Sequence, residues 1–214
     1  MTQKYIQLGE YGQLAEIQIN LPQSWNFEPI VSSVLGDEYR YTWPEDLKRL
    51  WSYHTDRCPG SLYGFLAGKL VEKLVEKNEI VREYLGVKNV EEMKEKEHFR
   101  IFAISGGGKC IADGVKHVLK TEPAFIQKSE GREVIIQSLK TGWELKIKVR
   151  ENVLKIVADS GFYEVQKRWK NAGSPRGEDD KLWKEFQRAG EDCCSTLITL
   201  PPSQFFRASL NPPI

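Results

Sequence analysis

A chain of 214 residues, 40% of them hydrophobic and 29% charged, is long enough to bury a core and is typical of a globular protein, which excludes a disordered chain. No apolar run approaches the roughly 18 residues that span a bilayer, and no charged and then apolar leader follows Met1, so we expect a cytoplasmic protein without a membrane partner. The net charge of +1 excludes a strong overall field, but positions 99–214 carry a net +5, so any polyanion is expected to meet this half.

The N-terminal half is expected to contain strands followed by helices. Alternating apolar and polar side chains predict a strand over 15–21, and a similar composition predicts another over 4–8. Apolar residues at helical spacing then predict a block of helices over about 43–97. The first of these helices is expected to begin at a capping box formed by Thr42 and Glu45.

The only glycine cluster of the chain follows a short apolar run, 99–104, that predicts a strand. The cluster consists of Ser105, Gly106, Gly107, Gly108 and Lys109. We interpret it as a hairpin turn, because glycine adopts the positive φ that tight turns require. The alternative is a phosphate- or oxyanion-binding loop before a helix, in which backbone N–H groups face the anion and Lys109 supplies the counter-charge. Gly114 inside that helix, and Cys110 where a P-loop has a hydroxyl residue, speak against the alternative.

Two alternating segments, 133–139 and 143–150, follow the glycine cluster and predict a pair of strands joined by a turn. The second segment has one apolar face and one cationic face. The cationic face consists of Lys146, Lys148 and Arg150, with Lys155 joining it across the next turn. Such a row of cations predicts weak, sequence-independent binding of a nucleic-acid backbone. The other interpretation is a solvated outer face, since lysines on strands also prevent aggregation.

The C-terminal third is expected to contain a strand at 153–158, helices within 161–190 and an edge strand at 196–200. The helical part is expected to end near Gly190, because glycine often follows the last turn of a helix.

The prolines near both ends of residues 201–214 predict an extended tail. Phe205, Phe206 and Leu210 within it would expose a large apolar surface to water. We therefore expect the tail to dock, either on its own domain or on a partner subunit, with these three residues as the candidate contacts.

The cysteines and histidines show no known metal-ligand spacing. They are Cys58, Cys110, Cys193, Cys194, His54, His98 and His117. Reduced, buried thiols are therefore expected, with no metal and no cofactor. A dyad such as Cys110 with His117 has no support beyond its spacing on one helix face, so the sequence assigns no catalytic residue.

These patterns predict an α+β fold. Its antiparallel sheet is expected to combine the two N-terminal strands with strands within 99–158, covered by helices at about 43–97 and 161–190. Residues 1–200 are expected to form one domain and residues 201–214 the tail. The predicted function is a non-catalytic subunit of a larger assembly, whose partners are protein subunits and, weakly, nucleic acid. The alternatives are an enzyme or ligand-binding protein that uses the glycine cluster, and an inhibitor or immunity-type protein.

Overall fold

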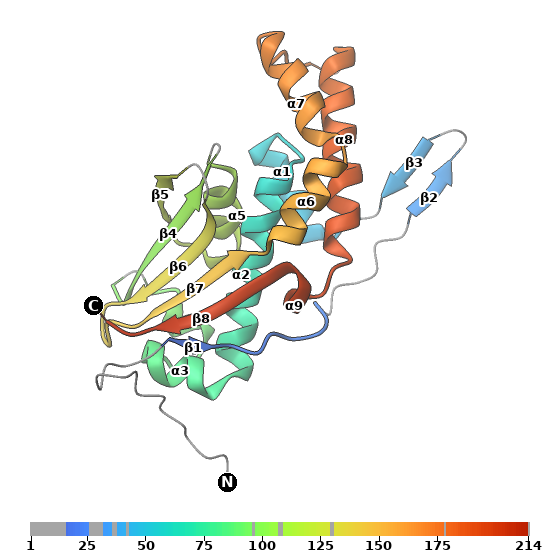
Figure 1. The fold of residues 1–214 in the computed structure, drawn as a ribbon. Coiled ribbons are helices and arrows are strands. Elements are labelled where there is room, and N and C mark those ends of the chain that lie inside the picture. The colour runs from blue at the N-terminus through green and yellow to red at the C-terminus, as the bar shows by residue number, and fades with distance from the viewer. Residues whose placement is uncertain are drawn as a thin grey trace.

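The computed structural model describes most of the chain and has the α+β fold that the sequence predicts (Figure 1). The described residues are 16–25, 32–35, 38–41, 43–95, 97–106, 109–128, 131–177 and 179–213. None of the helices in these ranges is both long enough and apolar enough to cross a membrane.

A mixed six-stranded sheet forms the centre of the molecule, with the strand order β1-β8-β7-β6-β4-β5. Its strands are β1 (Ile17–Gln18), β4 (Phe99–Ser105), β5 (Ala124–Gln127), β6 (Arg132–Ser138), β7 (Glu144–Val149) and β8 (Phe206–Asn211). Only β4 and β5 pair in parallel, whereas the other neighbours in this sheet are antiparallel. A separate two-stranded sheet pairs β2 (Ser32–Leu35) with β3 (Glu38–Tyr41).

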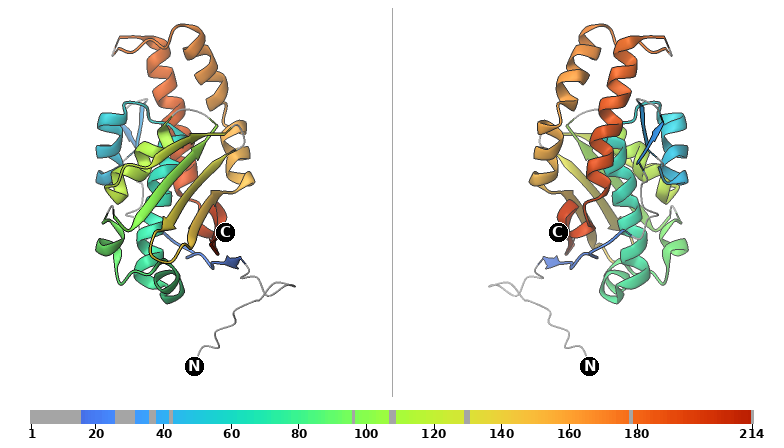
Figure 2. Two further views of the ribbon diagram at one scale, coloured as in Figure 1. Left: turned by 90° about the vertical axis from the view of Figure 1, so that its left-hand side faces the viewer. Right: turned by 90° about the vertical axis from the view of Figure 1, so that its right-hand side faces the viewer.

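Some of the helices cover one face of the sheet, and a helical hairpin extends beyond one end of it (Figure 1, Figure 2). The helices of the described residues are α1 (Glu45–His54), α2 (Pro59–Lys77), α3 (Glu79–Leu85), α4 (Val90–Met93), α5 (Cys110–Leu119), α6 (Glu151–Asp159), α7 (Phe162–Asn171), α8 (Lys181–Ile198) and α9 (Pro202–Phe205). Helices α2 and α5 lie behind the sheet in Figure 1, and the α7–α8 hairpin projects from the body in both views of Figure 2. Because Leu145 and Ile147 point from β7 toward the helices, the core lies between these two layers.

Glycines allow α2 and α5 to pack unusually closely. A Cβ atom on Gly64 would lie 2.1 Å from the carbonyl oxygen of Ile111, and one on Gly114 would lie 2.4 Å from the carbonyl oxygen of Ser61. Contacts of Gly68 with Val118 continue the same row. Since residue numbers increase together along both helices, α2 and α5 run in the same direction and their N-terminal ends meet.

The predicted extended tail is part of the fold. Strand β8 lies between β7 and β1, so it is an internal strand of the sheet. Phe205, Phe206 and Leu210 are buried in the chain's own core, with at most 1% of each residue exposed. The tail therefore docks on its own domain, and these side chains are not free to contact a partner subunit.

Two predicted strands are helical. Residues 153–158 belong to α6, where Val153 and Val157 face inward at the i, i+4 spacing of a helix. Residues 196–198 complete α8, which passes through Gly190 without ending there. The predicted helix end is wrong because Gly190 has a packing role: a Cβ atom there would lie 1.7 Å from the carbonyl oxygen of Arg57.

The N-terminal predictions are tested in part. Strand β1 lies within the predicted strand 15–21 but includes only Ile17 and Gln18. The predicted strand 4–8 and Thr42 lie outside the described residues. Pro44 is the N-cap residue of α1, so that helix begins without a side-chain cap hydrogen bond.

Candidate metal centre

The end of α1 and the beginnings of α2 and α5 bring together one imidazole and two thiols. His54 is the last residue of α1, Cys58 is the N-cap residue of α2, and Cys110 is the first residue of α5. Their nitrogen and sulfur ligand atoms all lie within 4.8 Å of one another. The sequence spacing does not reveal this cluster, and the prediction that no metal binds is not tested by it.

The close packing of α2 and α5 positions the two thiols. A Cβ atom on Gly60 would lie 2.9 Å from the Cβ atom of Cys110, closer than Cβ contacts normally are, so glycine lets Cys110 lie beside the first turn of α2. The backbone N–H of Ser61 donates a hydrogen bond to Cys58 Sγ at 3.4 Å. The hydroxyl of Ser61 is buried and accepts a hydrogen bond from Trp51 Nε1 at 3.0 Å, which fixes this first turn of α2 against α1.

Asp113 orients the imidazole. Nδ1 of His54 lies 2.8 Å from a carboxylate oxygen of Asp113, one turn along α5 from Cys110. This pairing places the Nδ1 proton on the carboxylate side, so that Nε2 faces Cys58 Sγ at 3.6 Å. A carboxylate behind the outer nitrogen of a histidine is the usual orienting contact of metal-binding imidazoles.

The electrostatics of the centre favour a thiolate on Cys58. Its pKa is held well below the usual range, chiefly by a hydrogen bond from the Cys110 thiol and then, against the effect of burial, by His54. The same hydrogen bond raises the pKa of Cys110. Burial lowers the pKa of His54, but Cys58 and Asp113 more than offset this and raise it to about 9. Both helix N-termini add positive potential at the thiols.

The α7–α8 hairpin holds the loop between His54 and Cys58. Arg176, before α8, donates a hydrogen bond to Thr55 Oγ1 at 2.8 Å and forms an ion pair with Asp56 at 3.2 Å. Gln187 on α8 accepts a hydrogen bond from the backbone N–H of Arg57 at 3.1 Å. Three consecutive loop positions, Thr55, Asp56 and Arg57, are thus fixed by contacts distant in sequence.

The glycine cluster leads into this centre and is not a hairpin turn. The chain passes from β4 into α5, and β4 pairs in parallel with β5, so the hairpin interpretation is wrong. Ser105 is buried at the end of β4, whereas Lys109 is exposed immediately before α5. Gly106 donates its N–H to the carbonyl oxygen of Gly131 at 3.2 Å. Gly107 and Gly108 lie outside the described residues, and an anion at this loop stays a prediction.

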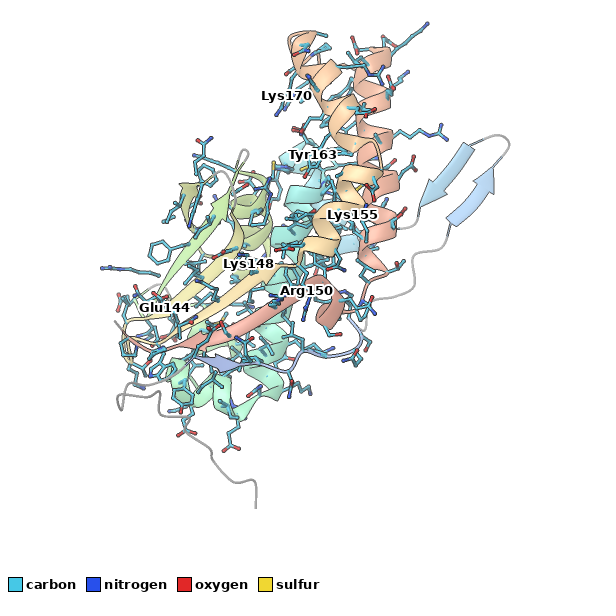
Figure 3. The ribbon with its side chains drawn as sticks, viewed as in Figure 1. Glu144, Lys148, Arg150, Lys155, Tyr163 and Lys170 are labelled. Carbon is cyan, nitrogen blue, oxygen red and sulfur yellow. The ribbon has the colours of Figure 1, made fainter. Side chains whose placement is uncertain are left out.

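The predicted cationic face is present on β7 but excludes Lys155. Lys148 lies on the side of the sheet away from α2 and α5, and Arg150 follows directly after the strand (Figure 3). Lys146 shares the side of Lys148, because the buried residues of β7 alternate with them. Lys155 belongs to helix α6, and its ammonium forms an ion pair with Asp159 at 2.6 Å. The turn that the sequence predicted before Lys155 is the first turn of α6.

Cys110 and His117, whose spacing was the only support for a dyad, do not form one. His117 Nδ1 lies 3.1 Å from the hydroxyl of Tyr53, and the histidine that approaches the thiols is His54. The spacing His54-x-x-x-Cys58 is a weak signal that pointed to this site. Cys110, 52 positions after Cys58, joins it only through the packing of two helices.

The chain matches no protein-family model, and a search of curated proteins finds no significant relative.

Proposed function

We propose that the protein binds one divalent transition-metal ion of the zinc class through Cys58, Cys110 and His54. The observation that carries this proposal is the convergence of two sulfur atoms and one imidazole nitrogen within 4.8 Å. Thiolate and imidazole are the ligands that such ions prefer over the harder Mg²⁺ and Ca²⁺. Burial supports the proposal, because the side chain of His54 is only 7% exposed and Cys58 is buried.

Three protein ligands leave one coordination position of a tetrahedral ion for a water molecule or a small ligand. Asp113 is engaged with His54 Nδ1 and acts as the orienting group. Sites with two cysteines, one histidine and an open position are of the catalytic type, in which the ion activates a bound water or polarises a substrate oxygen. The proposed function is therefore a metal-dependent one, with the substrate chemistry determined by what reaches the fourth position.

A second candidate is a cysteine nucleophile. The hydrogen-bonded series Asp113, His54 and Cys58 has the order of a catalytic triad, and the lowered pKa of Cys58 suits a nucleophile. We favour the metal because Cys58 is buried and a triad leaves the nearby Cys110 thiol without a role.

Metal stoichiometry separates the two candidates. Purified protein is incubated with excess Zn²⁺, desalted and assayed by elemental analysis; we expect one ion per chain, and clearly less than one in Cys58→Ser and Cys110→Ser, whose two remaining ligands hold the ion more weakly. Cys193→Ser is the matched control, because Cys193 is also a buried free thiol but lies outside the cluster. The nucleophile is favoured instead if no ion is retained and iodoacetamide alkylates Cys58 selectively in the native protein.

The predicted membership of a larger assembly stays a prediction. Burial of Phe205, Phe206 and Leu210 removes the tail as its partner-binding surface.

A further inference from the structure

A groove of about 760 Å³ crosses the face of the sheet opposite to α2 and α5. Its floor is formed by β7 and β8, and residues 16–23 form one wall. This groove is separate from the metal centre, because none of His54, Cys58 and Cys110 lines it.

Cations from both strands converge in the groove. Lys148 of β7 lies directly opposite Arg207 of β8 in the antiparallel register, and Lys146 and Arg150 flank this pair along the chain. Side chains at directly opposite positions share one face, and two like charges placed there destabilise a sheet. An anion that bridges Lys148 and Arg207 would offset this repulsion and stabilise the sheet.

Two carboxylates, Glu16 in the groove lining and Glu133 beside it, accompany the four cations, so the described residues leave the groove with a net positive charge. Glu133 of β6 lies 3.8 Å from the Lys146 ammonium and 3.4 Å from that of Lys148, and its side chain is only 16% exposed. The two lysine side chains remain 40% and 55% exposed. Nε of Arg150 donates a hydrogen bond to the carbonyl oxygen of Phe206 at 2.8 Å, which holds the side chain. Among the described residues the outer guanidinium nitrogens have no hydrogen-bond partner, so they can contact a ligand.

We infer that this groove binds the sugar–phosphate backbone of single-stranded nucleic acid. Side chains two positions apart on β7 are about 6.7 Å apart, so Lys146, Lys148 and Arg150 form a row of about 13 Å that follows several successive phosphates. Phe206 lines the groove but is 1% exposed, and no base can stack on it. Recognition is therefore electrostatic and independent of base sequence.

Binding is tested with a fluorescein-labelled single-stranded RNA of mixed sequence, followed by anisotropy at several salt concentrations. Three or four phosphate contacts predict a slope of log K against log salt of about −2 to −3, from about −0.7 for each contact on a single strand. We expect Lys148→Glu/Arg207→Glu to abolish binding. Lys170→Glu/Lys184→Glu is the matched control, because it makes the same charge change at exposed positions on α7 and α8 and should retain binding.

Thermal melting shows whether each variant is folded, and its zinc content shows whether the metal centre is intact. Loss of RNA binding by a folded variant with unchanged zinc content is therefore assigned to the groove. The inference is overturned if the parent shows no salt-sensitive binding or if both double variants bind equally well. It is also overturned if the parent binds no RNA and sedimentation shows that the parent is a dimer, which Lys148→Glu/Arg207→Glu converts to a monomer. The groove would then be an interface between copies of the chain.

Discussion

We expect Gly64→Ala to separate α2 from α5 and to weaken the metal centre at their N-terminal ends. The new Cβ atom would lie 2.1 Å from the carbonyl oxygen of Ile111, whereas such contacts essentially never fall below 3.0 Å. The helices must therefore move apart by about 1 Å locally, and overpacking of this kind costs about 1–3 kcal/mol. Alanine recovers about 1 kcal/mol through its higher helix propensity. The contact is with rigid backbone, so the upper part of the range applies and the net loss is about 1–2 kcal/mol.

Thermal unfolding followed by circular dichroism measures this loss. For a chain of this size, 1 kcal/mol corresponds to about 2–4 °C, so the melting temperature should fall by about 2–8 °C. If zinc binding requires the original distance between the helices, the same strain weakens the zinc affinity. A strain of about 1.4 kcal/mol corresponds to about a tenfold increase in the Kd for zinc. Gly177→Ala is the control, because a Cβ atom there meets nothing within 4 Å. An unchanged or higher melting temperature with unchanged zinc affinity would refute the proposed close packing of the helices.

Three further changes test the centre and the fold. Asp113→Asn should weaken zinc binding about 10–100-fold in a competition assay with a chromophoric chelator, since it alters the group that orients His54; a change below about twofold would remove that role. Trp51→Ala should cost about 3–5 kcal/mol in urea unfolding, because a buried indole and its hydrogen bond to Ser61 are lost, and a cost below about 1 kcal/mol contradicts its burial. Deleting residues 203–214 removes the internal strand β8 and should abolish cooperative unfolding; an unchanged melting curve would show that the tail is dispensable.

The sheet and most helices were predictable because their apolar periodicity is local. Residues 133–139 and 143–150 alternate cleanly, and they form β6 and β7 with the expected inward faces. In the sequence Gly114 speaks against a helix and Gly190 predicts the end of one, and both interpretations are wrong for the same physical reason. Each glycine lies inside a helix where another backbone approaches, a role that depends on distant residues and leaves no local pattern.

The proposed metal centre could not be derived from the sequence for the same reason. His54 and Cys58 are four residues apart, but one ends a helix and the other caps the next, so no single periodic element relates them. Cys110 reaches them only because glycines let α5 approach α2. The cationic row on β7 was predicted from alternation alone, whereas Arg207 was missed because the tail was not expected to form an internal strand.

X-ray absorption spectroscopy at the zinc edge tests the central claim most directly, because it reports the atoms bound to the ion. The zinc-loaded protein should show two sulfur neighbours at about 2.3 Å and nitrogen or oxygen neighbours at about 2.0–2.1 Å. One sulfur neighbour should be lost in Cys110→Ser, and Cys193→Ser should leave the spectrum unchanged. A coordination shell without sulfur, or one unaffected by Cys110→Ser, would contradict the assignment of Cys58 and Cys110 as metal ligands.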